Sequence, residues 1–204
     1  MNNKSMLKNK KFWIFTAFCA VILLVGWISN ELAIAYLFNH NLDKGERIHD
    51  IILDNISYYN VSVFVDITMV AAILLYLIYL FSKKSYADFP VVLLALGIFE
   101  ILRAIFIILT PTPAPCPGCK FGYIRPDFAG NFPSGHFAIP VFIFSYFLVK
   151  REYKLSICLG ILALINFIAI MLSFGHYTVD MVGTILLAYS IFLTLKHYGF
   201  FRKS

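Results

Sequence analysis

The chain has 204 residues, of which 60% are hydrophobic, 17% aromatic and only 14% charged, and its formal net charge is +6. Soluble domains typically contain about 25% charged residues. This composition, with a mean hydropathy of +0.80, therefore excludes an ordinary soluble domain and predicts an integral membrane protein. The basic residues are dispersed over short loops, which is typical of membrane topology and argues against a nucleic-acid partner.

The first apolar stretch follows a basic start, residues 1–11, and extends to about Ile28. It is longer than the core of a usual secretory signal and has no small-residue cleavage pattern, so we expect a retained first span. Polar breaks and Lys/Arg clusters divide the whole chain into six predicted transmembrane helices. Their ranges are 12–29, 60–81, 89–109, 137–149, 155–173 and 177–195.

We therefore expect an all-α, polytopic membrane protein with six transmembrane helices in one bundle, a single domain over residues 1–204. The fourth range is short, and we expect it to begin before Phe137 or to continue toward Glu152. An even number of spans places both termini on the same side of the membrane.

The Lys and Arg residues predict which side that is. Twelve of the 17 fall on the side of the termini, Arg103 lies within a span, and the opposite side has Lys44, Arg47, Lys120 and Arg125. Cytoplasmic loops carry the Lys/Arg excess, so we expect both termini to be cytoplasmic. The short loops and the Lys- and Asn-rich start suit a bacterial inner membrane.

Two loops on the opposite side differ from simple connections. In the first, four isoleucines at helical spacing predict an amphipathic interfacial helix over residues 48–56. The second, residues 110–133, contains six prolines and three glycines. Loops of this length are usually functional or disordered, and we expect this one to cover the site.

Cys116 and Cys119 in the second loop have the spacing of a redox motif, but no βαβ pattern surrounds them. A zinc site would need two further ligands, and His136 is the nearest candidate. On an oxidising outer face, a local disulfide that stiffens the loop is the expected role. We expect neither a metal nor a cofactor.

The first candidate site segment is residues 131–136, with the sequence Asn-Phe-Pro-Ser-Gly-His. Pro133 and Ser134 before an apolar stretch are helix start signals, and a helix start suits a phosphate oxygen. Gly135 permits close backbone approach, and His136 can protonate a leaving alkoxide. The alternative is a simple helix cap.

The second segment is residues 175–180, with the sequence Gly-His-Tyr-Thr-Val-Asp. Four-residue spacing places His176 and Asp180 on one helix face. The carboxylate can then orient the imidazole, leaving the other ring nitrogen as nucleophile or base. The alternative is a polar helix cap with a structural pair.

Together these segments resemble the second and third signature motifs of the type 2 phosphatidic acid phosphatase superfamily. Residues 175–180 are similar to its sphingomyelin-synthase-like branch, in which His-Tyr-Thr-Val-Asp is characteristic. The resemblance covers about residues 100–195. It implies six spans, cytoplasmic termini and a site that faces the outer or luminal side.

The resemblance also implies a metal-independent mechanism. His176, oriented by Asp180, would attack phosphorus and form a phosphohistidine, while His136 protonates the leaving oxygen. A lipid alcohol or water would then release the group. We expect a membrane lipid phosphotransferase that moves a phosphoryl or phospho-headgroup from a phospholipid to a lipid alcohol; the alternative is a phosphatase that hydrolyses phosphatidic acid or a related lipid phosphomonoester.

Some residues depart from the superfamily pattern. Its phosphatases carry a Lys, six residues and then Arg-Pro, whereas Lys120 and Arg125-Pro126 enclose only four residues. This stretch is either a degenerate phosphate clamp or a basic loop near lipid headgroups. Ile170 stands where the phosphatases have an Arg, which favours transfer, while Pro133 favours hydrolysis.

Three charged residues are predicted within the spans: Asp66, Glu100 and Arg103. Glu100 and Arg103 are three residues apart and can pair on one helix face. We expect one of them to line the active chamber and bind substrate, against a purely structural pair, and we expect Asp66 to be structural. The rival function is a transporter or lipid-binding protein that uses these three charges, with His176 and Asp180, as a proton or ion path.

Overall fold

The computed structural model describes residues 9–41, 45–83, 85–116 and 132–201, and within them all regular structure is helical. The elements in chain order are α2 (Lys10–Asn39), α3 (Val63–Lys83), the 3-10 helix η1 (Tyr86–Asp88), α4 (Phe89–Leu109), α5 (Gly135–Val149), α6 (Tyr153–Leu172) and α7 (Thr178–His197). The all-α prediction is confirmed for these residues.

Five of these helical segments are long and apolar enough to cross a membrane: α2, α3, α4 together with η1, α6 and α7. α5 is apolar but has only 15 residues. At about 1.5 Å per residue it is roughly 22 Å long, less than the hydrocarbon core of about 30 Å. Five of the six predicted spans are thus helices long enough to cross a membrane, while the fourth predicted span corresponds to the shorter helix α5.

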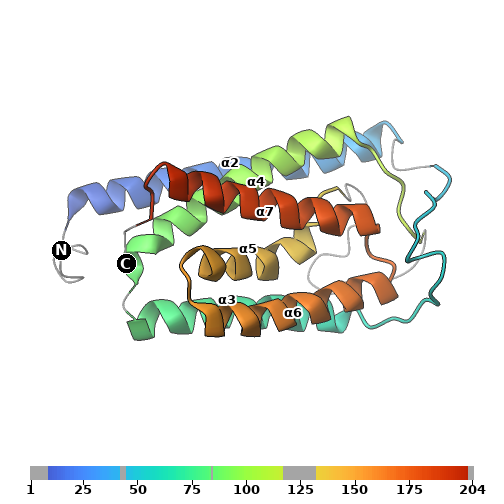
Figure 1. The fold of residues 1–204 in the computed structure, drawn as a ribbon. Helices are drawn as coiled ribbons and strands as arrows, with labels where there is room; N and C mark the ends of the chain where they lie inside the picture. The colour runs from blue at the N-terminus through green and yellow to red at the C-terminus, as the bar shows by residue number, and fades with distance from the viewer. Residues whose placement is uncertain (1–8, 42–44, 84, 117–131, 202–204) are drawn as a thin grey trace.

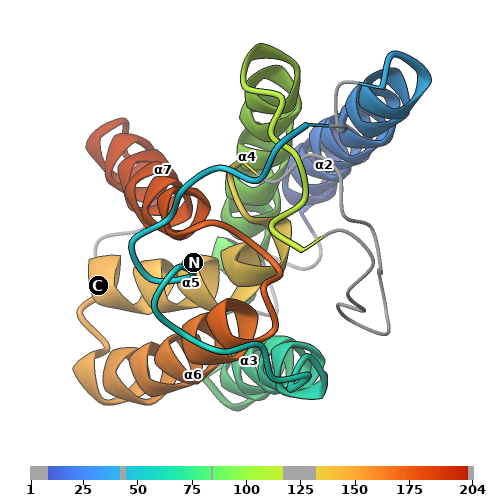
Figure 2. The same ribbon diagram turned by 90° about the vertical axis from the view of Figure 1, so that its right-hand side faces the viewer.

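The helices run alternately in opposite directions, so the start of α2 and the end of α7 lie at the same end of the bundle (Figure 1). α5 contacts α3, α6 and α7, whereas α2 packs on α4 at one edge (Figure 2). Because α5 is surrounded, its Phe142, Tyr146 and Phe147 are almost completely buried.

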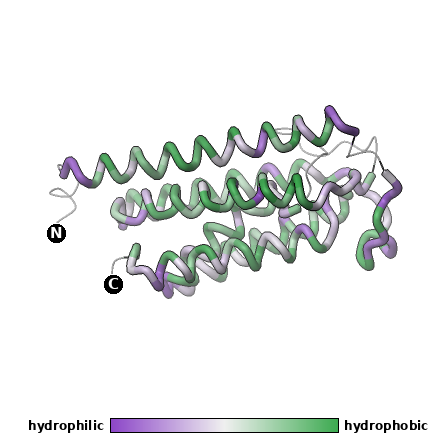
Figure 3. Tube along the Cα trace, turned by 90° about the horizontal axis from the view of Figure 1, so that it is seen from above, coloured by the Kyte–Doolittle hydropathy of each residue, from purple (hydrophilic) through white to green (hydrophobic). Residues whose placement is uncertain are grey.

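The longer helices are hydrophobic along most of their length, with hydrophilic residues near their ends (Figure 3), and their outward faces are largely apolar. Exposed side chains on these faces include Val21 on α2, Ile67 on α3 and Ile161 on α6. A soluble monomer rarely exposes contiguous apolar surface on this scale. The structure therefore supports an integral membrane protein.

α2 and α4 approach each other closely through two glycines. A Cβ on Gly26 would lie 2.8 Å from the Gly97 oxygen, and one on Gly97 would lie 2.8 Å from the Leu23 nitrogen. Small residues allow such close packing of transmembrane helices. The contact brings Asn30 of α2 beside Glu100 of α4.

α5 begins deeper in the bundle than the adjacent ends of α6 and α7 (Figure 1). Its start is defined locally by Ser134, whose Oγ accepts a hydrogen bond from the Phe137 N–H at 3.2 Å. Irregular backbone at membrane depth is tolerated only where protein buries it or where it lines a cavity. Ser134 is indeed fully buried.

The segment between α2 and α3 crosses the end of the bundle at which α7 begins (Figure 2). We refer to residues 45–62 as the strap. Its Tyr59 N–H donates to the Leu172 carbonyl at 2.8 Å, and its Val61 N–H donates to Ser173 Oγ at 3.2 Å. The strap is therefore fixed to the turn between α6 and α7.

The interfacial helix predicted over residues 48–56 is wrong, because this part of the strap is irregular at residues 48–50 and forms turns and bends at residues 51–56. The Asp50 carboxylate accepts hydrogen bonds from the Ile52 and Leu53 N–H groups. Such side-chain contacts compete with helical hydrogen bonding. Ile51 is left 82% exposed at the tip of the turn.

Candidate active site at the start of α5 and α7

His136 and His176 come together although 40 positions separate them in the sequence. His136 lies in the first turn of α5 and His176 in the turn before α7, and their ring centroids are 5.9 Å apart. His176 is only 4% exposed. The two candidate segments therefore form one site.

Asp180 orients both the turn and the imidazole. Its Oδ2 accepts a hydrogen bond from the Tyr177 N–H at 2.9 Å and lies 3.4 Å from His176 Nδ1. The carboxylate is completely buried, and its Oδ1 accepts no hydrogen bond from any described residue. The predicted pair of His176 and Asp180 is thus present.

The position of the Asp180 carboxylate indicates which ring nitrogen of His176 carries the proton. A carboxylate accepts hydrogen bonds, so Nδ1 carries the proton and Nε2 carries the lone pair. The distance of 3.4 Å exceeds the usual range of about 2.7–3.2 Å. Catalytic hydrogen bonds are often long in structures without substrate and shorten in the complex.

Main-chain contacts join the two segments directly. The Ser134 N–H donates to the Asp180 carbonyl at 3.3 Å, and the Thr184 hydroxyl, which donates to the Asp180 carbonyl at 2.7 Å, also lies 3.2 Å from the Ser134 carbonyl. Ser134 thus caps α5 and anchors it to the first turns of α7. Thr184 was not predicted, since a threonine within an apolar helix gives no sequence signal for a long-range contact.

Arg103 supports the first segment from α4. Its Nε donates to the Pro133 carbonyl at 2.9 Å, and a Cβ on Gly135 would lie 3.1 Å from its guanidinium carbon. Arg103 is 8% exposed. Gly135 therefore permits the close approach of the Arg103 guanidinium group, while the predicted approach of a phosphate to Gly135 remains a prediction.

The predicted pair of Glu100 and Arg103 is bridged by a residue that was not predicted. Arg103 Nη1 lies 3.9 Å from Glu100 Oε2. Asn30, which is fully buried, accepts from Arg103 Nη1 at 2.9 Å and donates to Glu100 Oε2 at 2.6 Å. Asn30 satisfies both charged groups at once, which buried ionic groups require. A substrate-binding role for Glu100 or Arg103 remains a prediction.

Asp50 of the strap holds the start of α7. Its carboxylate accepts from the Thr178 N–H at 2.6 Å and from the Thr178 hydroxyl at 2.7 Å, and the Ile48 N–H donates to the Tyr177 hydroxyl at 3.2 Å. Burial disfavours the charged form of Asp50, but hydrogen bonds from Leu53, Thr178 and Ile52 outweigh it and lower its pKa.

The remaining predicted positions lie partly outside the described residues. Lys120, Arg125 and Cys119 lie outside the described residues, so the phosphate-clamp prediction is untested. Cys116 is disulfide-bonded. Asp66 is buried in the first turn of α3.

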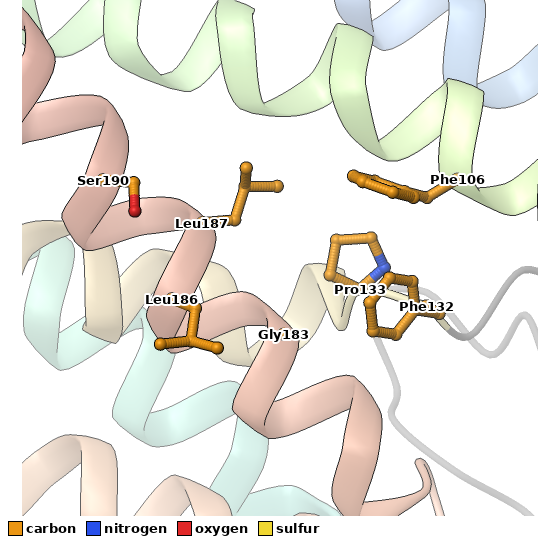
Figure 4. A pocket seen from close by; sticks show the side chains of 7 residues that line it. All are labelled: Phe106, Phe132, Pro133, Gly183, Leu186, Leu187 and Ser190. Atoms are coloured by element: carbon orange, nitrogen blue, oxygen red, sulfur yellow. The ribbon is translucent and has the colours of Figure 1, made fainter.

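An apolar pocket lies beside the site, between α4 and α7 (Figure 4). It has a volume of about 290 Å³. Its lining residues are Phe106, Phe132, Pro133, Gly183, Leu186, Leu187 and Ser190. Pro133, whose carbonyl Arg103 holds, thus borders both the pocket and the histidine site.

The fold and site define a polytopic helical membrane protein with two histidines and a buried carboxylate beneath one end of the bundle. Comparisons with family models, with curated proteins and with solved structures find no match. The superfamily resemblance therefore depends on the two segments themselves.

Proposed function

We propose that this protein is a membrane lipid phosphotransferase of the type 2 phosphatidic acid phosphatase kind, acting through a phosphohistidine. The observation that carries the proposal is the approach of His136 and His176 to 5.9 Å between ring centroids, beside the buried Asp180. Attack distances of about 3–3.5 Å and proton-transfer distances of about 2.6–3.2 Å allow one phosphoryl group to reach both rings.

In the first step, His176 Nε2 attacks phosphorus and the bond to the leaving oxygen breaks. His136, protonated, gives its proton to that oxygen, and the phosphoryl group remains on His176. Asp180 stabilises the positive imidazole through Nδ1. The N-terminal end of α5 directs the positive end of its helix dipole toward the phosphoryl oxygens.

In the second step, His136 removes a proton from the acceptor hydroxyl, which attacks phosphorus and releases His176. A lipid alcohol as acceptor gives transfer, and water gives hydrolysis. Two observations favour transfer: His176 is only 4% exposed, and α5 starts below the ends of its neighbours. Hydrolysis of a lipid phosphomonoester is the alternative outcome of the same chemistry.

The proposal places the site on the outer, periplasmic or luminal side, with both termini cytoplasmic. It is supported by the basic residues at the helix ends away from the histidines, which include Lys10 at the start of α2, Lys83 at the end of α3 and Lys196 in the last turn of α7. A bacterial inner membrane suits this arrangement.

The experiment that tests the proposal uses purified protein in detergent. It is offered a fluorescent phosphatidic acid and, separately, a choline- or inositol-phosphate lipid with ceramide or diacylglycerol. Headgroup transfer to the added acceptor would support transfer, and free phosphate from phosphatidic acid would assign water as acceptor. Absence of both, with lipid or ion flux in vesicles, would favour the transporter.

The same assay tests the metal-independent mechanism. Turnover is expected to be unchanged when a chelator is added, because the proposed steps use only His136, His176 and Asp180. Loss of turnover that zinc or magnesium restores would contradict this mechanism.

A further inference from the structure

The pocket between α4 and α7 has an apolar lining and an unusual position. Only one of its seven lining residues, Ser190, carries a polar side chain, and none is charged. Its volume of about 290 Å³ is near the lower end of the roughly 300–1,000 Å³ typical of small-molecule pockets. A polar headgroup or an ion would find almost no partner there.

The pocket leads away from the histidine site into the depth of the membrane. On α7, Gly183 follows Asp180 by three residues, and Ser190 lies seven residues further on. Seven residues of helix correspond to about 10 Å. The lining therefore starts near the catalytic carboxylate and continues about two turns toward the opposite side of the membrane.

The pocket also opens sideways. Leu186 is 64% exposed, and Ser190 is also exposed. This part of α7 therefore lies at the outer surface of the bundle, and the pocket opens there between α4 and α7 (Figure 4). Because α4 and α7 are membrane-spanning helices by length and composition, those surroundings are lipid chains in a bilayer. A chain can thus enter without crossing water.

We propose that this pocket holds one acyl chain of the lipid substrate and orients its phosphoester toward His176. The inference rests on the proposed function and adds where the lipid lies. The occupant is a hydrocarbon chain because the lining is apolar and opens toward lipid. The pocket also lies next to the first histidine segment, since its lining residues Phe132 and Pro133 directly precede Ser134 in the chain.

The pocket selects by shape rather than by hydrophobic attraction. An acyl chain that leaves the bilayer for the pocket exchanges one hydrocarbon environment for another, so little hydrophobic free energy is gained. What the pocket supplies is orientation of the reacting group, and small misplacements of that group reduce rates strongly.

The test uses substitutions that fill the pocket and leave His136, His176 and Asp180 in place. Ser190→Phe and Leu187→Phe place a ring in the cavity, and Leu164→Phe on α6, where Leu164 is 58% exposed, is the matched control. A lipid with a photoreactive diazirine in its acyl chain is cross-linked to each protein, and the labelled residues are mapped by mass spectrometry. This readout does not require turnover.

The expected result is labelling concentrated on the α4 and α7 lining in the wild type and the control, and lost in Ser190→Phe. Values of kcat/KM for long-chain substrate should fall at least about tenfold in the filled variants, while those for a water-soluble short-chain analogue stay unchanged. Equal labelling in Ser190→Phe and Leu164→Phe would overturn the proposal.

Two further outcomes separate this proposal from the proposed function. Turnover with labelling spread evenly over the lipid-facing surface would overturn the pocket and leave the catalytic function. Labelling confined to the pocket, with no phosphoester ever consumed, would overturn the catalytic function and leave a lipid site.

Discussion

A carboxylate is buried at each end of the bundle, but the two carboxylates have different interaction partners. At the end away from the histidines, Asp88 lies 3.1 Å from Lys150 Nζ and accepts from the Tyr146 hydroxyl at 3.0 Å. At the histidine end, Asp180 has one oxygen without a hydrogen bond from any described residue and the other beside an imidazole.

This difference separates a structural pair from a candidate catalytic one. At the Asp88 end, the buried carboxylate pairs with a lysine ammonium, and this ion pair connects η1 with the end of α5. A buried carboxylate beside an imidazole, a side chain suited to general acid–base and nucleophilic chemistry, is an arrangement typical of functional sites. The predictions below use the Asp88 end as an internal control for the Asp180 end.

The largest expected effect is on catalysis at the histidine end. His176→Ala removes the nucleophile, and Asp180→Asn keeps the shape of the side chain while removing its charge. We expect His176→Ala to lower kcat at least about 10⁴-fold and Asp180→Asn to lower it strongly as well. Lipid turnover assays measure both, and full activity in either folded variant would contradict the mechanism.

The matched substitution, Asp88→Ala at the end away from the histidines, should lower the stability of the folded protein. Asp88→Ala leaves Lys150, whose side chain is 14% exposed, without its partner. Removing one member of a buried ion pair costs about 3 kcal/mol. Thermal unfolding in detergent should show this loss, while kcat of the folded fraction stays unchanged. A large fall in kcat would contradict the assignment of Asp88 to a purely structural role.

A smaller effect is expected from Asn30→Ala, which acts through Arg103. Loss of the hydrogen bonds of Asn30 to Arg103 and Glu100 should loosen the support of the Pro133 carbonyl. We expect kcat to fall about tenfold with little change in KM. A change confined to KM would indicate that Arg103 binds substrate directly instead of positioning the segment.

The smallest expected effect is a pH-dependent loss of stability in Asp50→Asn. Asp50 ionised accepts two hydrogen bonds from Thr178, and loss of such a cap costs about 1 kcal/mol. The pKa of Asp50 is below its ordinary value of 3.8, so its contribution is complete above the unfolded-state pKa and is lost as pH falls through the folded-state pKa.

Unfolding measured against pH checks this prediction. The difference between wild type and Asp50→Asn should be constant near neutral pH and should shrink only below about pH 4. A difference that disappears near pH 6 would instead indicate a histidine. Glu46→Gln, which changes an exposed carboxylate of the strap, is the matched control.

The helices were predictable because their signal is local. Apolar stretches of sufficient length are visible in the sequence, and the predicted range 89–109 coincides with α4. The first span was predicted over residues 12–29, and whether its helix continues over residues 31–38 into the interface was left open. It continues to Asn39, because Asn30 is bonded to Glu100 and the next turns bury Ala33, Ile34 and Leu37.

The sequence by itself determined the membrane class, the five long helices and the pairing of His176 with Asp180, because hydrophobicity and four-residue spacing act within one segment. Tertiary structure alone decided that His136 meets His176, that α5 starts deep, that the strap is not a helix, and that Asn30 and Asp50 support the site. These contacts join residues far apart in the chain, and their free energy overrides local preference only once the bundle has formed.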